Sequence, residues 1–95
     1  MLGKSVYKVP DGKLLKISLE FQGEKIISVK ITGDFFLYPE EGIEAIEKSL
    51  SGKKLDRKLI AGEVSRAVQK NSIELFGISA EGIAEGVLLA GGAAK

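Results

Sequence analysis

Cysteine and histidine are both absent from this 95-residue chain. Their absence excludes disulfides, thiolate nucleophiles, imidazole acid-base catalysis and zinc sites built from imidazole or thiolate ligands. Few common catalytic designs are compatible with that loss. A chain without cysteine is also compatible with a reducing compartment, so we expect a cytoplasmic protein.

Long hydrophobic runs are absent too. The longest tract of small and apolar residues, 86–94, is well short of the ~20 residues that span a bilayer. Residues 1–4 do not begin the apolar core of a signal peptide. We therefore expect a soluble protein with no membrane partner.

Neither sign of charge is in large excess. Lysine and arginine total 14 and aspartate and glutamate total 13, which gives a net charge of +1. The charges are unevenly distributed, because residues 1–30 and 51–72 are basic whereas 31–50 and 73–95 are acidic. Such blocks create local potentials that steer partners. Nucleic acid is not an expected partner, because the chain lacks a strongly basic balance and no aromatic residue is interleaved with the basic residues of 53–58.

The length of the chain indicates one domain, residues 1–95, which buries about 60 to 65 per cent of its unfolded surface. Apolar residues make up 44% and charged residues 28%, as in ordinary folded domains. We identify no internal repeat and no linker.

Alternation of apolar and polar residues predicts three strands. The first covers residues 5–9 and leads into a turn at 9–12, where proline and glycine favour a reversal of the chain. The second and third strands each have one apolar face, formed by Leu15, Ile17, Leu19 and Phe21 in the second and by Ile27, Val29 and Ile31 in the third. The pattern predicts a three-stranded antiparallel meander with one apolar side.

The period then changes to that of a helix. A first helix with Ile43, Ile46 and Leu50 on one face ends near Gly52. Asp56 is placed to begin a second helix that ends near Asn71, in which Gly62 indicates a break or a close packing contact. Ser79 is placed to cap a third. The sequence thus predicts an α+β fold, with the meander covered on one face by about three helices.

Residues 31–41 take an alternating strand into a glycine-aspartate turn and then into a cluster of aromatic residues. Gly33 and Asp34 suit the turn. Local folding does not explain the rings that follow, which are costly in a connection unless something covers them. Two interpretations stay open: the rings pack in the core, or the segment docks a larger partner. The rings belong to Phe35, Phe36 and Tyr38.

Three other motifs have weaker functional interpretations. Lys13 follows Gly12 at the first hairpin, but the long glycine loop and helix of a phosphate site are missing, so a solvated hairpin is favoured. The basic residues within 53–58 are typical of a solvated helix entrance, although an acidic partner stays possible. Gly82, Gly86 and Ala90 recur every four residues and indicate close packing within the chain or, alternatively, a subunit interface.

Five motifs in order resemble the small accessory domain of lipoate-protein ligases. They are Gly12-Lys13-Leu14-Leu15, Ile31-Thr32-Gly33-Asp34-Phe35-Phe36, Pro39-Glu40-Glu41, Leu50-Ser51-Gly52-Lys53-Lys54 and Leu75-Phe76-Gly77-Ile78-Ser79. The resemblance covers about residues 8–89, and the glycine-aspartate-phenylalanine segment is its most specific part. In many bacterial ligases this domain is the C-terminal part of one polypeptide, whereas in some archaea it is a separate subunit. A chain of this length resembles the separate subunit.

The resemblance implies an accessory subunit that forms a heterodimer with a large catalytic subunit. Such ligases activate lipoate with ATP to lipoyl-adenylate and transfer the acyl group to a lysine of a lipoyl domain. The small domain is needed mainly for activation. Lipoate, ATP and Mg would bind at the partner's active site, while this chain alone would hold no cofactor or metal, contribute no catalytic residue and have no ligase activity. Lipoyl domains of acceptor proteins are further partners.

We place the partner contact at the turn and its rings, with two lysines supporting the partner's nucleotide site. The contact residues are Gly33, Asp34, Phe35, Phe36 and Tyr38, and the lysines are Lys13 and Lys30. The main alternative is a self-associating module unrelated to lipoylation, which would use a sheet edge or the small-residue strip. A small enzyme that uses carboxylates and lysines is a third and remote class, because Asp34 has no second titrating group near it in the sequence.

Overall fold

The structure is a computed structural model that describes residues 1–9 and 13–92. Its elements follow the order β1, β2, β3, β4, α1, α2, β5 and α3. The strands are Leu2–Lys8, Leu14–Gln22, Lys25–Gly33, Phe36–Tyr38 and Glu74–Phe76, and the helices are Gly42–Leu50, Arg57–Lys70 and Ala80–Ala90. The predicted turn at 9–12 and the end of the chain beyond residue 92 lie outside the described residues, apart from Val9.

The strands form two separate sheets. Strands β1, β2 and β3 make an antiparallel sheet in that order, with Ile17 facing Ser5 on one side and Ile31 on the other. Strands β4 and β5 form a small antiparallel ribbon. The sequence predicted the meander but not the ribbon.

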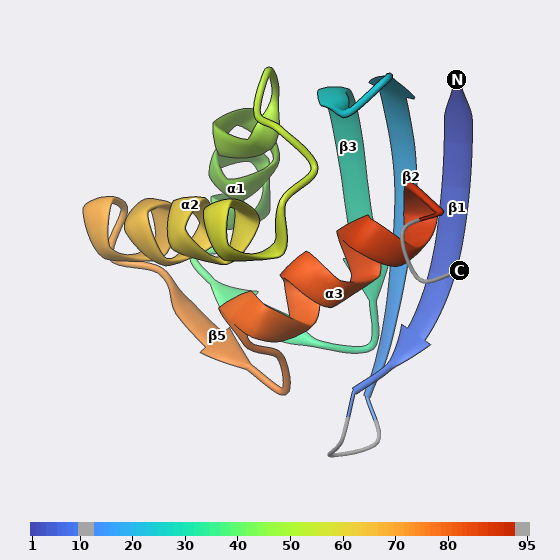
Figure 1. Ribbon diagram of the computed structural model, residues 1–95. Helices are drawn as coiled ribbons and strands as arrows, with labels where there is room; N and C mark the ends of the chain where they lie inside the picture. The colour runs from blue at the N-terminus through green and yellow to red at the C-terminus, as the bar shows by residue number, and fades with distance from the viewer. Residues whose placement is uncertain (10–12, 93–95) are drawn as a thin grey trace.

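The helices lie on one side of the three-stranded sheet (Figure 1). Helix α3 packs across β1 and β2, α1 packs against β3, and α2 rests on both helices. The predicted α+β architecture, a meander covered on one face by three helices, is confirmed.

The core lies between the sheet and the helices, and the middle strand supplies its centre. Leu15, Ile17 and Leu19 of β2 are almost completely inaccessible to solvent. Helix α3 approaches them closely because it has a glycine there: a Cβ on Gly86 would lie 2.8 Å from Leu15 Cδ2. The small residues of α3 therefore serve packing within the chain, as the sequence favoured.

The apolar face predicted for the third strand is wrong at one residue. Ile27 is 42% exposed, whereas its neighbour Ile26 is fully buried. The register explains the exchange, because Glu20 faces Ser28 but Phe21 faces Ile26, so that Ile27 is an extra residue in a β-bulge. The bulge shifts the alternation by one position, and Val29 and Ile31 remain buried beyond it.

Two further expectations about the backbone meet different outcomes. Helix α2 runs without interruption through Gly62, where an added Cβ would meet no atom within 4 Å, so neither a break nor a close contact is present. Ser79 caps α3 as predicted, because its Oγ accepts a hydrogen bond from the N–H of Gly82 at 3.0 Å.

Candidate partner-docking site

The β4–β5 ribbon presents aromatic rings on its solvent side. Phe36 faces Phe76 and Tyr38 faces Glu74 across the ribbon, so these four side chains share one face. The exposed fractions are 75% for Phe36, 70% for Tyr38 and 51% for Phe76. We call the surface formed by Phe36, Tyr38, Glu74 and Phe76 the aromatic face.

The opposite side of the ribbon anchors it to the body of the protein. Leu37 and Leu75 face each other there and pack against the hydrophobic core. Buried Gly42, the first residue of α1, allows this approach, since an added Cβ would lie 2.8 Å from Ile73 Cγ1 and 3.1 Å from Leu37 Cδ1. Alternation along the short strands therefore directs leucines inward and aromatic rings outward.

The turn before the ribbon separates the three rings of the predicted segment. Gly33 has a φ of +154°, and the N–H of Asp34 donates to the carbonyl of Leu14 at 3.0 Å. Phe35 then folds over Gly33 and packs against the core, whereas Asp34 remains exposed. Of the two interpretations left open by the sequence, core packing applies to Phe35, while Phe36 and Tyr38 are exposed and do not pack in the core.

Lys13 lies near one end of the aromatic face. A Cβ built on Gly77 would lie 3.0 Å from Cγ and 3.2 Å from Cε of Lys13, so the lysine stem runs alongside Gly77, which follows Phe76 directly. Glu74 marks the other end of the face, opposite Tyr38. The aromatic face is thus flanked by a cation and contains an anion.

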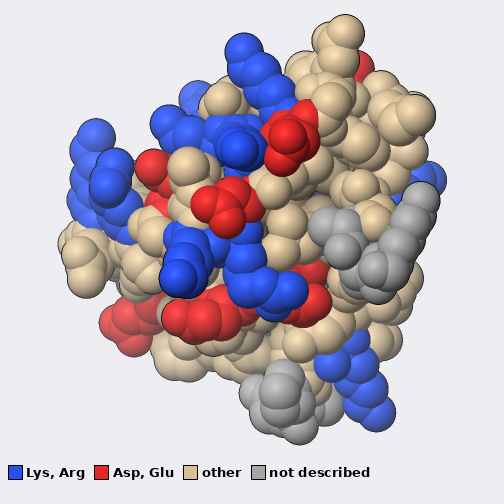
Figure 2. Space-filling view, viewed as in Figure 1, with Lys and Arg blue, Asp and Glu red and all other residues tan. Residues whose placement is uncertain are grey.

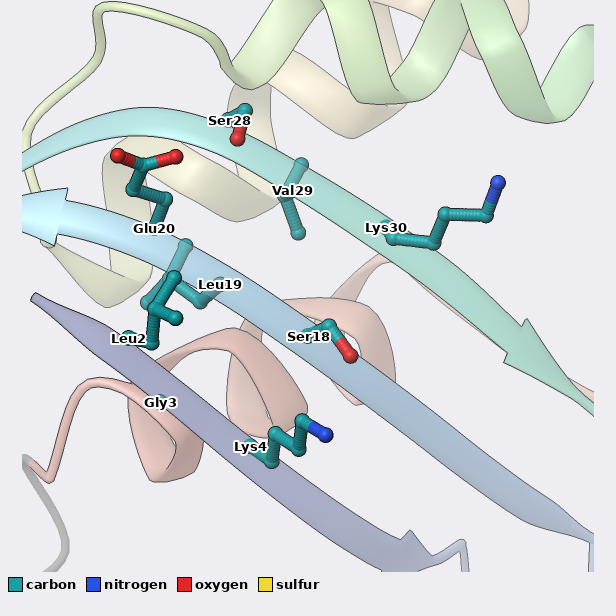
Figure 3. Close-up of a pocket in the computed structure, with 9 residues that line it drawn as sticks. All are labelled: Leu2, Gly3, Lys4, Ser18, Leu19, Glu20, Ser28, Val29 and Lys30. Carbon is teal, nitrogen blue, oxygen red and sulfur yellow. The ribbon is translucent and has the colours of Figure 1, made fainter.

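Lys30 lies elsewhere. It faces Ser18 on the outer side of the three-stranded sheet, away from the helices, in a row that continues to Lys4 (Figure 3). Its side chain is exposed on the side of the sheet that the helices leave open. The structure therefore does not bring Lys30 together with Lys13 and the aromatic face.

Sequence reasoning missed Phe76 and Glu74 as members of this surface. Nothing in the local sequence of residues 73–78 indicates that this connection contains a strand that pairs with residues 36–38. The sequence did contain one signal for this surface. Leu75 and Phe76 are adjacent apolar residues in a connection, and the rings of residues 35–38 have the same unusual placement.

Within residues 1–9 and 13–92, no group of three or more aspartates and glutamates could hold a metal ion. The basic residues near the start of α2 are partly paired, since Arg57 contacts Glu85 and Lys54 lies 4.0 Å from Glu24. On the face seen in Figure 2, acidic and basic side chains are intermixed.

In the described part of the chain, no helix has both the length and the apolar character needed to cross a membrane.

Two comparisons with known proteins concern the ligase family and its archaeal members. The chain is 34% identical over 44 residues to "Lipoate-protein ligase A subunit 2" of Thermoplasma acidophilum, a match that covers 46% of this chain and 47% of that protein. A solved structure described as a bi-partite lipoate protein ligase and its E2 lipoyl domain from the same organism contains a similar chain. That chain has a TM-score of 0.78 and 23% identity, with 92% of this chain and 94% of that one covered.

The solved structure supports the fold described above, and the curated match spans about half the length of its relative. The family model described as "Bacterial lipoate protein ligase C-terminus" matches residues 8–85, which is most of the chain. The match includes the turn at Gly33 and both strands of the ribbon. The chain belongs to the family of lipoate protein ligase C-terminal domains.

Proposed function

We propose that this chain is a non-catalytic accessory subunit of a lipoate-protein ligase and that it works with a separate, large catalytic subunit. The observation that carries the proposal is the aromatic face, in a member of a family whose domain is described as the C-terminus of a ligase. The similarity to a protein named as the second subunit of a ligase supports the divided arrangement.

The size and composition of the aromatic face suit a protein partner. Its three rings expose on the order of 400 Å² of mostly apolar surface, which is about half of what one partner contributes to a stable interface. Aromatic residues are frequent among the side chains that dominate binding energy. Lys13 and Glu74 supply opposite charges at the two ends, which would fix the orientation of the partner.

In this proposal the catalytic subunit binds lipoate, ATP and Mg and carries out both chemical steps in the cytoplasm. It activates lipoate to lipoyl-adenylate and transfers the acyl group to a lysine of a lipoyl domain. The present chain promotes the activation step by docking through the aromatic face and the adjacent turn at Asp34, which helps to order the nucleotide site of its partner. Lys13, at the end of that face, is the lysine placed to assist.

The test is lipoyl-adenylate formation by the purified catalytic subunit, measured with labelled ATP and lipoate, with and without this chain. We expect product only in the mixture. The variants Phe36→Ala and Tyr38→Ala should weaken association roughly 10- to 100-fold, which is typical of central aromatic contacts. Ile27→Ala, at an exposed apolar residue outside the aromatic face, is the matched control and should behave as wild type.

Equal adenylation in the presence and absence of this chain would remove the activation role. Normal association of folded Phe36→Ala and Tyr38→Ala variants would instead show that the partner uses another surface. A stable dimer of the isolated chain with no affinity for a ligase subunit, observed by sedimentation, would favour the self-associating module.

A further inference from the structure

The two edges of the three-stranded sheet differ in their hydrogen bonding. The outer edge of β3 is closed by the end of α1 and the loop after it. Ile26 donates its N–H to Lys53 O at 2.8 Å, Ile26 O accepts from Gly52 N at 2.7 Å, and Ile27 O accepts from Ser51 Oγ at 2.8 Å. Further along, the N–H of Ile31 donates to Glu47 Oε2 at 2.8 Å.

The outer edge of β1 has no such cover from the described residues. Met1 bonds to Phe21 of β2, and Val9 bonds to Lys13, the residue before β2, so the odd-numbered residues of this antiparallel ladder face β2. The even-numbered residues direct their N–H and C=O groups away from the sheet. Those residues are Leu2, Lys4, Val6 and Lys8, and within residues 1–9 and 13–92 no backbone or side-chain group bonds to them from outside the sheet.

The inner face of β1 is anchored to α3. Ser5 Oγ donates to the carbonyl of Gly86 in α3 at 2.7 Å. Gly3 lies against the end of α3, where an added Cβ would meet Ala90 O at 1.8 Å. These contacts keep β1 extended over its full length, so its outward groups form a regular, preorganised row rather than a fraying end.

The side chains beside this edge are strongly biased toward positive charge. On the outer face of the sheet, Lys16 has lysines at its diagonal positions on both neighbouring strands, and within the ranges given for β1, β2 and β3 Glu20 is the acidic residue of that face. Those lysines, Lys4, Lys8 and Lys30, make no ion pair with the described residues, and neither does Lys16. Figure 3 shows Lys4, Ser18 and Lys30 side by side around a shallow hollow of about 340 Å³.

We propose that β1 is a strand-addition site for an extended acidic segment of the catalytic subunit, in which every second residue faces the outer side of the sheet and these residues are carboxylates and apolar side chains in turn. The backbone of the incoming segment would pair with the even-numbered residues of β1. Its carboxylates would meet the lysines, and its apolar residues would cover Leu2 and Val6, which are 79% and 65% exposed. This inference rests on the proposed function, because that proposal supplies the catalytic subunit as partner.

A second copy of the chain fits the edge poorly. Antiparallel pairing of β1 with itself, with Lys4 opposite Val6, would satisfy the backbone. It would also place the lysines of both copies on one continuous outer face, with Glu20 of each copy as the opposing charge. Lysines on an edge strand discourage such self-pairing, whereas an acidic strand turns the same charges into a recognition feature.

The test uses Val6→Pro, which removes an outward N–H while leaving the bonds between β1 and β2 in place. We expect its affinity for the purified catalytic subunit, measured by titration calorimetry, to fall about tenfold or more. The matched control Val6→Thr keeps the N–H and changes only the side chain, so it should lose much less affinity than Val6→Pro. Lys4→Glu with Lys30→Glu should also weaken binding, and the salt dependence seen with wild type should decrease.

Unchanged affinity of a folded Val6→Pro variant would overturn the proposal. If that variant loses the circular dichroism of wild type, the double charge reversal decides instead, and unchanged affinity there overturns it. A wild-type dimer that Val6→Pro dissociates would overturn the assignment of the occupant in favour of a second copy. Failure of the wild-type chain to bind or stimulate the catalytic subunit would be a failure of the proposed function, which the adenylation assay with and without this chain identifies separately.

Discussion

Strands β1 and β3 are both edge strands of one sheet, and the protein treats them differently. The chain leaves β3 through the ribbon and returns along it in α1, so that a carboxylate, a serine and two backbone groups cover the β3 edge. Among the residues that the structure describes, α3 covers the inner face of β1, and no hydrogen bond from outside the sheet closes its outer edge. The comparison teaches that backbone closure of β3 contributes to stability, whereas the unclosed backbone of β1 is available for recognition.

We expect the largest loss of stability from a substitution that weakens the packing of α1, the helix that closes the β3 edge. Leu50, the last residue of α1, is fully buried, so Leu50→Ala should lower the free energy of unfolding by about 2–5 kcal/mol. The measurement is urea denaturation followed by circular dichroism. Leu2→Ala, at an exposed leucine on the open edge, should change it by less than about 0.5 kcal/mol. Equal losses for the two variants would contradict the difference between the edges.

A second test concerns the packing of β1 against α3. Gly3→Ala places a methyl group against the backbone carbonyl of Ala90, so α3 must shift, and we expect a loss of about 1–3 kcal/mol in the free energy of unfolding. Gly62→Ala is the matched control, because its Cβ enters open space within a helix. It should stabilise the protein by up to about 1 kcal/mol. Opposite signs from the same substitution are the expected result in thermal unfolding.

A third test removes one hydrogen bond from the closed edge. Glu47→Ala takes away the acceptor of the Ile31 N–H and should cost about 1–2 kcal/mol, because that group is partly buried and the acceptor is charged. Hydrogen exchange of the Ile31 amide should accelerate, while the amides of β1 should not respond. Glu44→Ala, an exposed acid of the same helix, is the control. An unchanged Ile31 amide would show that this bond does not protect the edge.

The sequence predicted the elements whose signal is local. The alternation in β2 identified Leu15, Ile17 and Leu19 as core, and Ser79 was identified as a helix cap because its partner lies only three residues away. The bulge at Ile27 was not predictable, since it depends on pairing between two strands. The local pattern there favours the wrong alternation.

The sequence predicted two of the four residues of the aromatic face. Phe36 and Tyr38 were identified by their own segment, but their neighbours Phe76 and Glu74 come from a strand far away in the sequence. A ribbon with three-residue strands has too few residues for a recognisable period. The role of Glu47 was not predictable either, because an acid on an amphipathic helix is usually solvated and its partner Ile31 lies on another element.

The smallest expected effect concerns the lysines on the outer face of the sheet, beside the open edge of β1. Lys16 lies diagonally between Lys4, Lys8 and Lys30, so Lys16→Glu should replace repulsion by attraction and raise the free energy of unfolding by about 0.5–1 kcal/mol at low salt. Lys16→Gln should give roughly half that gain, and both gains should shrink in 1 M salt, where the screening length is about 3 Å. A protein that keeps a mildly unfavourable cluster of lysines beside an open edge gives up stability for a positive surface. If Lys16→Glu both stabilises the fold and weakens binding of the catalytic subunit, that surface serves recognition; stabilisation with unchanged binding would leave the lysines only as guards against self-pairing.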